Sequence, residues 1–273
     1  MVRCYLSGNP VHDRVIRAFY DGCPEEKALV SLNGYEPSDV AVVFGIRKSK
    51  VPISFPRGRV IEEQRKAGLD VLVLETGYLK RGDGPDDYYA AGWNGLNGRA
   101  DFRNAESPPD RFDALMIHVK QWREHGEHII VCGQVPWDAS VDHLDYKAWR
   151  RKTLATLEGH GRRVIYKEHP ALEPGPPLHT FLKDAWAVVT LNSNSAVEAA
   201  IEGIPVFAFD IGSMAWEIAE HDLEALGNPK TPDRAQWLAN LAYAQWTPSE
   251  LSQGLAWRHL MSRSPAPTLA ATN

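Results

Sequence analysis

The feature that most constrains the fold of this chain is its alternation of short apolar runs with longer amphipathic stretches. The runs have the length of buried strands and the stretches between them have the spacing of amphipathic helices, a pattern typical of βαβ construction. We expect strands at 2–6, 28–32, 40–44, 71–74, 128–132, 163–166, 187–190 and 206–209. The pattern therefore predicts an α/β fold built around parallel sheets.

Seven amphipathic stretches are expected to form helices, at 13–20, 59–67, 111–124, 146–158, 196–202, 233–245 and 249–261. With 273 residues the chain is long enough for two domains. We expect two Rossmann-like lobes, residues 1–125 and 126–263, with a ligand cleft between them and a flexible tail at 264–273. The irregular stretch 76–109 is unusually long for a connection, which indicates a functional loop.

Composition excludes several classes of protein. The chain has no run of about 18 apolar residues, so no membrane span is expected. Its three cysteines lack metal-binding spacing and suit a reducing cytoplasm. Residues 47–66 nevertheless gather seven basic side chains against two acidic ones. This stretch is either a solvated face or the contact surface of an anionic partner.

The strongest local signal is a run of four small polar residues directly after an expected buried strand. Asn192, Ser193, Asn194 and Ser195 stand there, immediately before an expected helix. Small side chains and the unpaired N–H groups of a helix start are suited to phosphate, although Ser and Asn are also ordinary helix caps. Glu198, one turn later, is a candidate acceptor for ribose hydroxyls or a plain surface carboxylate.

Two further strand ends carry polar residues in the same half of the chain. Lys167 and His169 end the expected strand 163–166 and can neutralise a departing diphosphate. Gln134 and Ser140 follow the strand 128–132 and can hydrogen-bond a nucleotide or a sugar. We expect all these side chains to bind the donor substrate.

The first half supplies candidates for acid–base chemistry. Glu75 ends the strand 71–74, where a carboxylate is either a general base or a structural acceptor. Asp101, His12 and Asp13 are reserve candidates for the base. The Gly-rich and Asn-rich stretch 92–102 forms either an acceptor-binding loop or a rigid structural loop. The residues expected to bind the acceptor are Arg47, Lys48, Lys50, Arg57, Arg59, Trp93, Asn94 and Arg99.

The sequence lacks the P-loop, the G-x-G-x-x-G fingerprint, H-E-x-x-H and G-x-S-x-G. Nothing in it requires a metal, and we expect no cofactor besides a donor substrate.

Taken together, the Gln134–Ser140 loop, the Lys167–Pro170 run and the Asn192–Val206 run resemble the donor half of GT-B type glycosyltransferases, closest to the capsule Kdo-transferase-like group. The stretch Glu75–Tyr78 is similar to the E-D-G-[FY] motif of that group, with Thr76 in place of the Asp. The stretch 92–102 and the compact size also resemble phage-encoded DNA-modifying glycosyltransferases.

The resemblance implies a metal-independent transferase that moves a sugar from a nucleotide-sugar to an acceptor hydroxyl. The basic stretch favours 5-hydroxymethylated pyrimidines of phage DNA as acceptor, in the cytoplasm of the host, since phosphate contacts need Lys and Arg. A capsule or lipopolysaccharide glycan is the alternative. A sugar-nucleotide epimerase and a non-catalytic module that binds a nucleotide-sugar or DNA are the other hypotheses.

Overall fold

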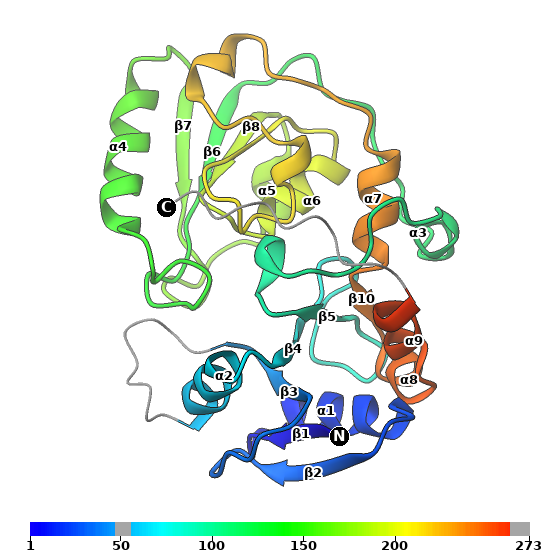
Figure 1. Ribbon diagram of the computed structural model, residues 1–273. Helices are drawn as coiled ribbons and strands as arrows, with labels where there is room; N and C mark the ends of the chain where they lie inside the picture. Colours follow the sequence, from blue (N-terminus) through cyan, green and yellow to red (C-terminus); the bar gives the residue numbers. More distant parts are fainter. Residues whose placement is uncertain (47–55, 263–273) are drawn as a thin grey trace. The chain divides into compact units, whose positions relative to one another are not determined.

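The computed structural model describes residues 1–46 and 56–262. These residues form two compact α/β units, each built on its own sheet (Figure 1). Unit 1 consists of residues 1–46, 56–112 and 238–262, and unit 2 of residues 113–237. The expected α/β class with parallel sheets is confirmed.

Unit 1 contains a six-stranded sheet in the order β10-β5-β4-β3-β1-β2. Strands β4, β3, β1 and β2 run parallel to one another. Strand β5 is antiparallel to β4, and β10 is antiparallel to β5. Its strands are β1 (Val2–Leu6), β2 (Lys27–Ser31), β3 (Val40–Phe44), β4 (Asp70–Thr76), β5 (Tyr89–Trp93) and β10 (Gln245–Trp246).

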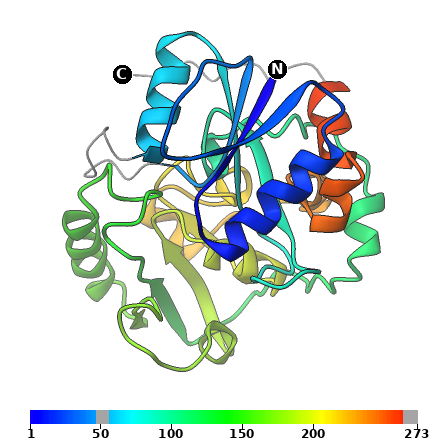
Figure 2. The same cartoon turned by 90° about the horizontal axis from the view of Figure 1, so that it is seen from below.

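Alternate residues of this sheet build two different cores. Leu72 and Leu74 of β4 contribute to the core under α1 (Pro10–Gly22), which also holds α8 (Pro248–Ser252) and α9 (Leu255–Ser262). Val71 and Val73 contribute to the opposite core, under α2 (Pro56–Lys66). Figure 2 shows α1 in blue with the orange-red C-terminal helices, and α2 in cyan on the other face. The strand period of two therefore decides which helix each side chain meets.

The C-terminal segment belongs to unit 1, which corrects the expected division into 1–125 and 126–263. The boundary falls after residue 112, and again within α7 (Ala235–Ala242). The physical reason is the burial of Trp246, Trp257 and Leu260 in the core under α1.

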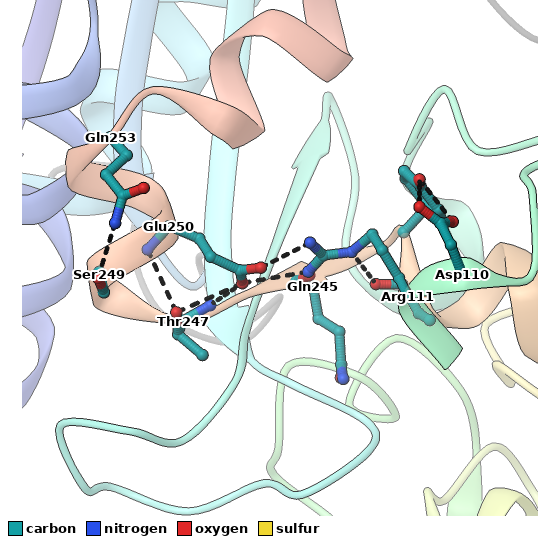
Figure 3. A network of polar contacts seen from close by, with 9 residues as sticks. Asp110, Arg111, Gln245, Thr247, Ser249, Glu250 and Gln253 are labelled. Atoms are coloured by element: carbon teal, nitrogen blue, oxygen red, sulfur yellow. Dashed lines mark hydrogen bonds and ion pairs between the residues drawn. The ribbon is translucent and has the colours of Figure 1, made fainter. Parts of the chain in front are cut away.

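A polar network ties this segment to α3 (Asp110–Ala114), as Figure 3 shows. Arg111 donates to both carboxylate oxygens of Glu250, at 2.6 and 3.1 Å, and to the Gln245 carbonyl at 2.9 Å. The guanidinium also lies 4.0 Å from the ring centre of Trp246. Thr247 and Glu250 form a capping box at the start of α8. The network fixes the end of the chain onto the first unit.

Unit 2 contains a fully parallel four-stranded sheet in the order β7-β6-β8-β9. Leu154 and Leu157 of α4 pack on one face of it, and α6 lies against β8 and β9. The elements are β6 (His128–Cys132), α4 (Tyr146–Glu158), β7 (Arg163–Lys167), α5 (Leu178–Leu182), β8 (Ala185–Thr190), α6 (Ser195–Ile201) and β9 (Val206–Ala208), followed by the 3-10 helices Trp216–Ile218 and Leu223–Gly227.

Two expectations about local structure were wrong. The helix expected at 111–124 is only the five-residue α3, and the stretch 76–109 contains the buried strand β5 and the 3-10 turn Asn97–Arg99. Among residues 1–46 and 56–262, no helix has both the length and the apolar character needed to span a membrane.

Candidate functional site

The carboxyl edge of the sheet in unit 2 gathers the polar residues that the sequence singled out. Because all four strands run parallel, the residues after β6, β7, β8 and β9 meet at one edge. The chain passes from β6 to β7 on one side and then to β8 on the other, so the crevice of a doubly wound sheet falls between β6 and β8. Gln134 follows β6 and Asn192 follows β8, on the two sides of this crevice.

A buried hydrogen-bond network joins these two residues. Gln134 Nε2 donates to Asn192 Oδ1 at 2.7 Å, and Gln134 Oε1 accepts from the Asn192 backbone N–H at 3.1 Å. Asn192 Nδ2 then donates to Asp210 Oδ2 at 2.6 Å and to the Ser140 carbonyl at 2.8 Å. Gln134, Asn192 and Asp210 are all buried. The network holds the loops after β6, β8 and β9 in one arrangement, and Asp210 joins it although the sequence analysis did not single this residue out.

A second chain of hydrogen bonds links the loops after β6 and β7. The Gln134 N–H donates to Tyr146 Oη at 2.8 Å, Tyr146 Oη lies 3.4 Å from Tyr166 Oη, and the Tyr166 hydroxyl donates to Glu168. Glu168 Oε1 also accepts from the His169 N–H at 2.9 Å. A Cβ at Gly133 would lie 2.5 Å from Glu168 Oε1, so only glycine permits this approach. Tyr146 and Glu168 thus position His169, a role that the sequence did not reveal.

Lys167 and His169 present their polar ends at this edge from β7 and the loop after it. His169 Nδ1 accepts from the Ala171 N–H at 3.2 Å, which places the proton of the neutral ring on Nε2. In the described part of the chain, Lys167 has no carboxylate within ion-pair distance, and its Nζ lies 5.6 Å from the Phe181 ring centre. Both side chains are half-buried. Such a pair can offer two donors and positive charge to an anion.

The Asn192–Ser195 run does more than cap a helix. Asn194 occupies the N-cap of α6 without a side-chain capping bond. Ser193 Oγ accepts from the Ser195 N–H at 3.2 Å. Ser195 Oγ is buried and, among the described residues, has no nitrogen or oxygen partner; its polar neighbour is the Cys132 thiol. A thiol is a weak hydrogen-bond partner for a buried hydroxyl, which favours a ligand that supplies a stronger one.

Cys132, at the end of β6, shows which of these side chains lie together. Burial raises the pKa of its thiol to about 11, while Ser195 and Lys167 act in the opposite direction and Glu198 in the same one. Lys167, Ser195 and Glu198 therefore all lie within electrostatic range of one sulfur atom. Glu198 is exposed on α6.

Unit 1 brings a second set of polar residues to the carboxyl edge of its own sheet. Glu75 projects from β4 on the face of α2, where the first turn of that helix carries Arg57. A Cβ at Gly45, directly after β3, would lie 3.2 Å from an Arg57 guanidinium nitrogen and 3.3 Å from Glu75 Oε2. Gly45 has a φ of +71°, a backbone conformation that glycine adopts without strain. The missing side chain also leaves room for the charged groups of Arg57 and Glu75. Burial lowers the pKa of Arg57, and Glu75 raises it.

His12 reaches the same edge from the first turn of α1. Its ring stacks on Phe44, with centroids 4.0 Å apart and planes at 8°. Asp13, next to it, accepts from the Ser7 N–H at 2.7 Å and from the Gly8 N–H at 3.1 Å, and so closes the loop between β1 and α1.

Other residues expected near the acceptor lie elsewhere in unit 1. Trp93 pairs with Leu72 in the core under α1, on the face of the sheet opposite Glu75. Asp101 forms a bridge with Trp93 and an ion pair with Arg103 at 2.8 Å.

Asn94 is held at the amino end of β4 by Val71 N and Asp70, and Arg99 ends the exposed turn that follows. Trp93, Asn94, Arg99 and Asp101 therefore lie away from the end of β4 that carries Glu75, and their expected role in binding the acceptor stays a prediction.

The basic stretch is described only in part. Arg47, Lys48 and Lys50 lie outside the described residues. Arg59 is exposed on α2, and Arg57 lies beside Glu75. Among residues 1–46 and 56–262, no group of three His, Cys, Asp or Glu side chains is arranged to hold a metal ion.

The fold is a mixed α/β, Rossmann-like one. It is similar to that of Thermosulfurimonas dismutans KpsC, β-Kdo 2,4-transferase, with a TM-score of 0.57 and 14% identity over 88% of this chain and 89% of that one. The β-Kdo 2,7-transferase of the same KpsC gives a TM-score of 0.54 and 16% identity over 93% of this chain and 98% of that one. No protein-family model matches the sequence, and a search of curated proteins finds no match.

Proposed function

We propose that the chain is a glycosyltransferase that takes its sugar from a nucleotide-sugar bound at the carboxyl edge of unit 2. The observation that carries this proposal is the grouping of Lys167 and Ser195 around one point of that edge, beside the Cys132 thiol. Among the described residues, Lys167 has no carboxylate partner and Ser195 Oγ has no nitrogen or oxygen partner. The diphosphate of a nucleotide-sugar supplies the negative charge and the acceptor oxygens that these two side chains lack.

The same residues suit the chemistry of the departing group. When the bond between the anomeric carbon and the phosphate oxygen breaks, its electron pair stays on the phosphate. Lys167 Nζ and the His169 Nε2–H can stabilise that charge as it develops. In this proposal the two side chains supply the charge stabilisation, and no metal ion is needed for the step.

The Gln134–Asn192–Asp210 network contributes by preorganisation. It consists of buried groups that are already hydrogen-bonded to one another, so the loops that hold Ser193 and Ser195 do not have to be ordered when the donor binds.

For the acceptor we propose a hydroxyl of a capsule or lipopolysaccharide glycan, positioned at the carboxyl edge of unit 1. The names of the two similar structures, both Kdo transferases, support a glycan and suggest Kdo as the first donor sugar to test. Modified DNA has less support than the basic stretch indicated, since Arg57 lies beside Glu75.

The test is a thermal-shift screen of the whole protein against UDP-, GDP-, CMP- and dTDP-linked sugars. A donor at 100 times its dissociation constant should stabilise the fold by about 2.7 kcal/mol. Product analysis with the donor that binds then separates the candidates. Transfer to an added glycan supports the proposal, an epimerised nucleotide-sugar indicates an epimerase, and binding without turnover indicates a non-catalytic module.

Salt dependence distinguishes the two acceptors. Binding to hydroxymethylated DNA should weaken with a log–log slope of about −0.9 for each phosphate contacted, whereas glycan binding should change little with salt. A mobility-shift titration at several salt concentrations measures the slope. Tight, salt-dependent binding together with transfer to DNA would replace the glycan proposal.

A further inference from the structure

The edge of unit 1 offers three candidates for the group that deprotonates an acceptor hydroxyl: Glu75, Asp13 and His12. Two of them are already occupied by neighbouring groups. Asp13 accepts three hydrogen bonds, from Ser7 N, Ser7 Oγ and Gly8 N, and these hold the loop after β1. Its side chain therefore serves to hold that loop closed.

Glu75 also has neighbouring groups at both oxygens. Oε1 accepts from the Thr76 N–H at 2.9 Å. Oε2 lies beside Gly45, next to the guanidinium of Arg57. The two side chains interact electrostatically, with Glu75 raising the pKa of Arg57. The Glu75 carboxylate thus already has a backbone donor at one oxygen and a cation near the other.

His12 is the candidate whose ring nitrogens form no hydrogen bond within the described part of the chain. Its Nδ1 is buried, and among the described residues neither ring nitrogen has a hydrogen-bond partner. The stacking on Phe44 holds the ring flat against the residue that precedes Gly45. The crevice of this sheet falls between β1 and β3, because the chain crosses from β2 to β3 on the other side of β1. His12 follows β1, and Phe44 ends β3.

We propose that His12, and not Glu75, is the general base that accepts the proton of the acceptor hydroxyl. This inference rests on the proposed function. In the step that consumes the acceptor, its oxygen forms a bond to the anomeric carbon and its proton passes to a ring nitrogen of His12. The electron pair of the bond that breaks leaves with the group that the oxygen displaces.

The electrostatic surroundings fit this role. Burial lowers the pKa of His12, and Arg57 on α2 lowers it further, while Asp13 on α1 and Asp83 after β4 act in the opposite direction. A lowered pKa keeps the imidazole neutral, and therefore able to accept a proton, at neutral pH.

The experiment compares four proteins: wild type, His12→Gln, Glu75→Gln and the control His160→Gln. His160 is matched to His12 because its Nδ1 is also buried and without a partner among the described residues, but it lies after α4 at the amino end of β7. Glycan transfer should fall at least about 10²-fold in His12→Gln and stay within about twofold of wild type in the control. The thermal shift with the donor should be unchanged in both, which shows that they are folded.

The pH profile gives a readout that a structural role would not move. Wild-type transfer should rise with pH through the lowered pKa of His12, below about 6.5, and then level off. That rise should disappear in His12→Gln and persist in Glu75→Gln. His12→Ala leaves a flat gap on Phe44, and added imidazole should restore part of its activity.

The opposite pattern overturns the inference. If His12→Gln transfers within about threefold of wild type, or if the rise with pH disappears in Glu75→Gln instead, His12 is not the base. A wild-type protein that turns over no nucleotide-sugar overturns the proposed function itself, which is a different result.

Discussion

Gln134 and Asn192 form two hydrogen bonds with each other across the crevice between β6 and β8. The Gln134 side chain donates to the Asn192 side chain at 2.7 Å, and it accepts from the Asn192 backbone N–H at 3.1 Å. Both ends of the Asn192 side-chain amide are therefore hydrogen-bonded, since its Nδ2 also donates to Asp210 and to the Ser140 carbonyl. An amide at position 192 can satisfy all these partners, and a carboxylate cannot.

The first prediction follows from these hydrogen bonds of the Asn192 amide. In Asn192→Asp a carboxylate oxygen replaces Nδ2 and faces Asp210 Oδ2, so two buried like charges meet. The pKa of the introduced carboxyl should therefore rise, and the loss of stability should grow as the pH rises above about 4. We expect a loss on the order of 3 kcal/mol at pH 7.5 and a smaller one at pH 5, measured by urea unfolding. Asn228→Asp, at an exposed position, is the control. An equal loss at both pH values would contradict the argument.

Gln245 plays a similar part in unit 1 for the segment that follows Glu75. Its buried side chain accepts from Tyr78 N at 2.7 Å and Leu79 N at 2.9 Å, and donates to the Leu79 carbonyl at 3.1 Å. Gln245→Leu removes these bonds and should destabilise the protein by about 3 kcal/mol. Hydrogen exchange should quicken at residues 78 and 79. The control Gln253→Leu, at an exposed position of the same segment, should change neither the stability nor the exchange rates. If residues 78 and 79 exchange as slowly in Gln245→Leu as in wild type, the Gln245 hydrogen bonds do not hold this segment.

The positions of Gln134, Lys167, Asn192 and Ser195 could be predicted from the sequence because each follows an apolar run. Parallel strands bring such residues to one edge. Strand β5 could not be predicted, since Tyr89–Trp93 contains small residues and Gly92, and its place depends on Phe102 packing where a side chain at 92 would be.

The attachment of the C-terminal helices to unit 1 could not be predicted from the sequence either. It depends on long-range contacts, such as Phe19 with Trp257, that leave no local pattern. The approach of Arg57 to Glu75 is long-range in sequence as well, so the local pattern around either residue did not predict it.

The third prediction concerns His169. His169→Ala removes the Nε2–H donor from the donor edge, and glycosyl transfer should fall by about 10²-fold or more, as it does when an oxyanion donor is lost. The matched control is His179→Ala, at an exposed position of α5 in the same unit. Steady-state kinetics of both variants would be compared at saturating donor. A normal rate in folded His169→Ala would leave the residue with a structural role only.

The fourth prediction tests the pair in Figure 3. Arg111 and Glu250 are largely buried, with 15% and 22% of their side chains exposed. Arg111→Lys cannot keep the two-pronged contact or the stacking on Trp246, so it should cost about 1–2 kcal/mol. A double-mutant cycle with Glu250→Gln should give a coupling energy of about 1 kcal/mol. The ion pair Lys66–Glu63, which is more exposed, should show less than half of this coupling. Additive losses at Arg111 and Glu250 would mean that the pair does not fix the C-terminal segment.

The last prediction uses Cys132 to report on the same edge of unit 2. Burial raises the pKa of its thiol from 9.0 to about 11, so the folded protein keeps the proton that the unfolded chain loses above pH 9. Cys132 should therefore cost the folded state nothing at pH 8, and stability should fall as the pH rises from 9 towards 11, by an amount on the order of 2 kcal/mol. Tyrosines and the other cysteines titrate in the same range, so the measurement is the difference between wild type and Cys132→Ala. The wild type should lose more stability than the variant between pH 8 and pH 10.5.

Because Lys167 and Ser195 lie beside the thiol, a bound nucleotide-sugar should also slow the labelling of Cys132 by a thiol reagent at pH 9. Identical pH dependence in the two proteins would show that the thiol is not buried as described, and labelling that donor leaves unchanged would place the donor away from Lys167 and Ser195.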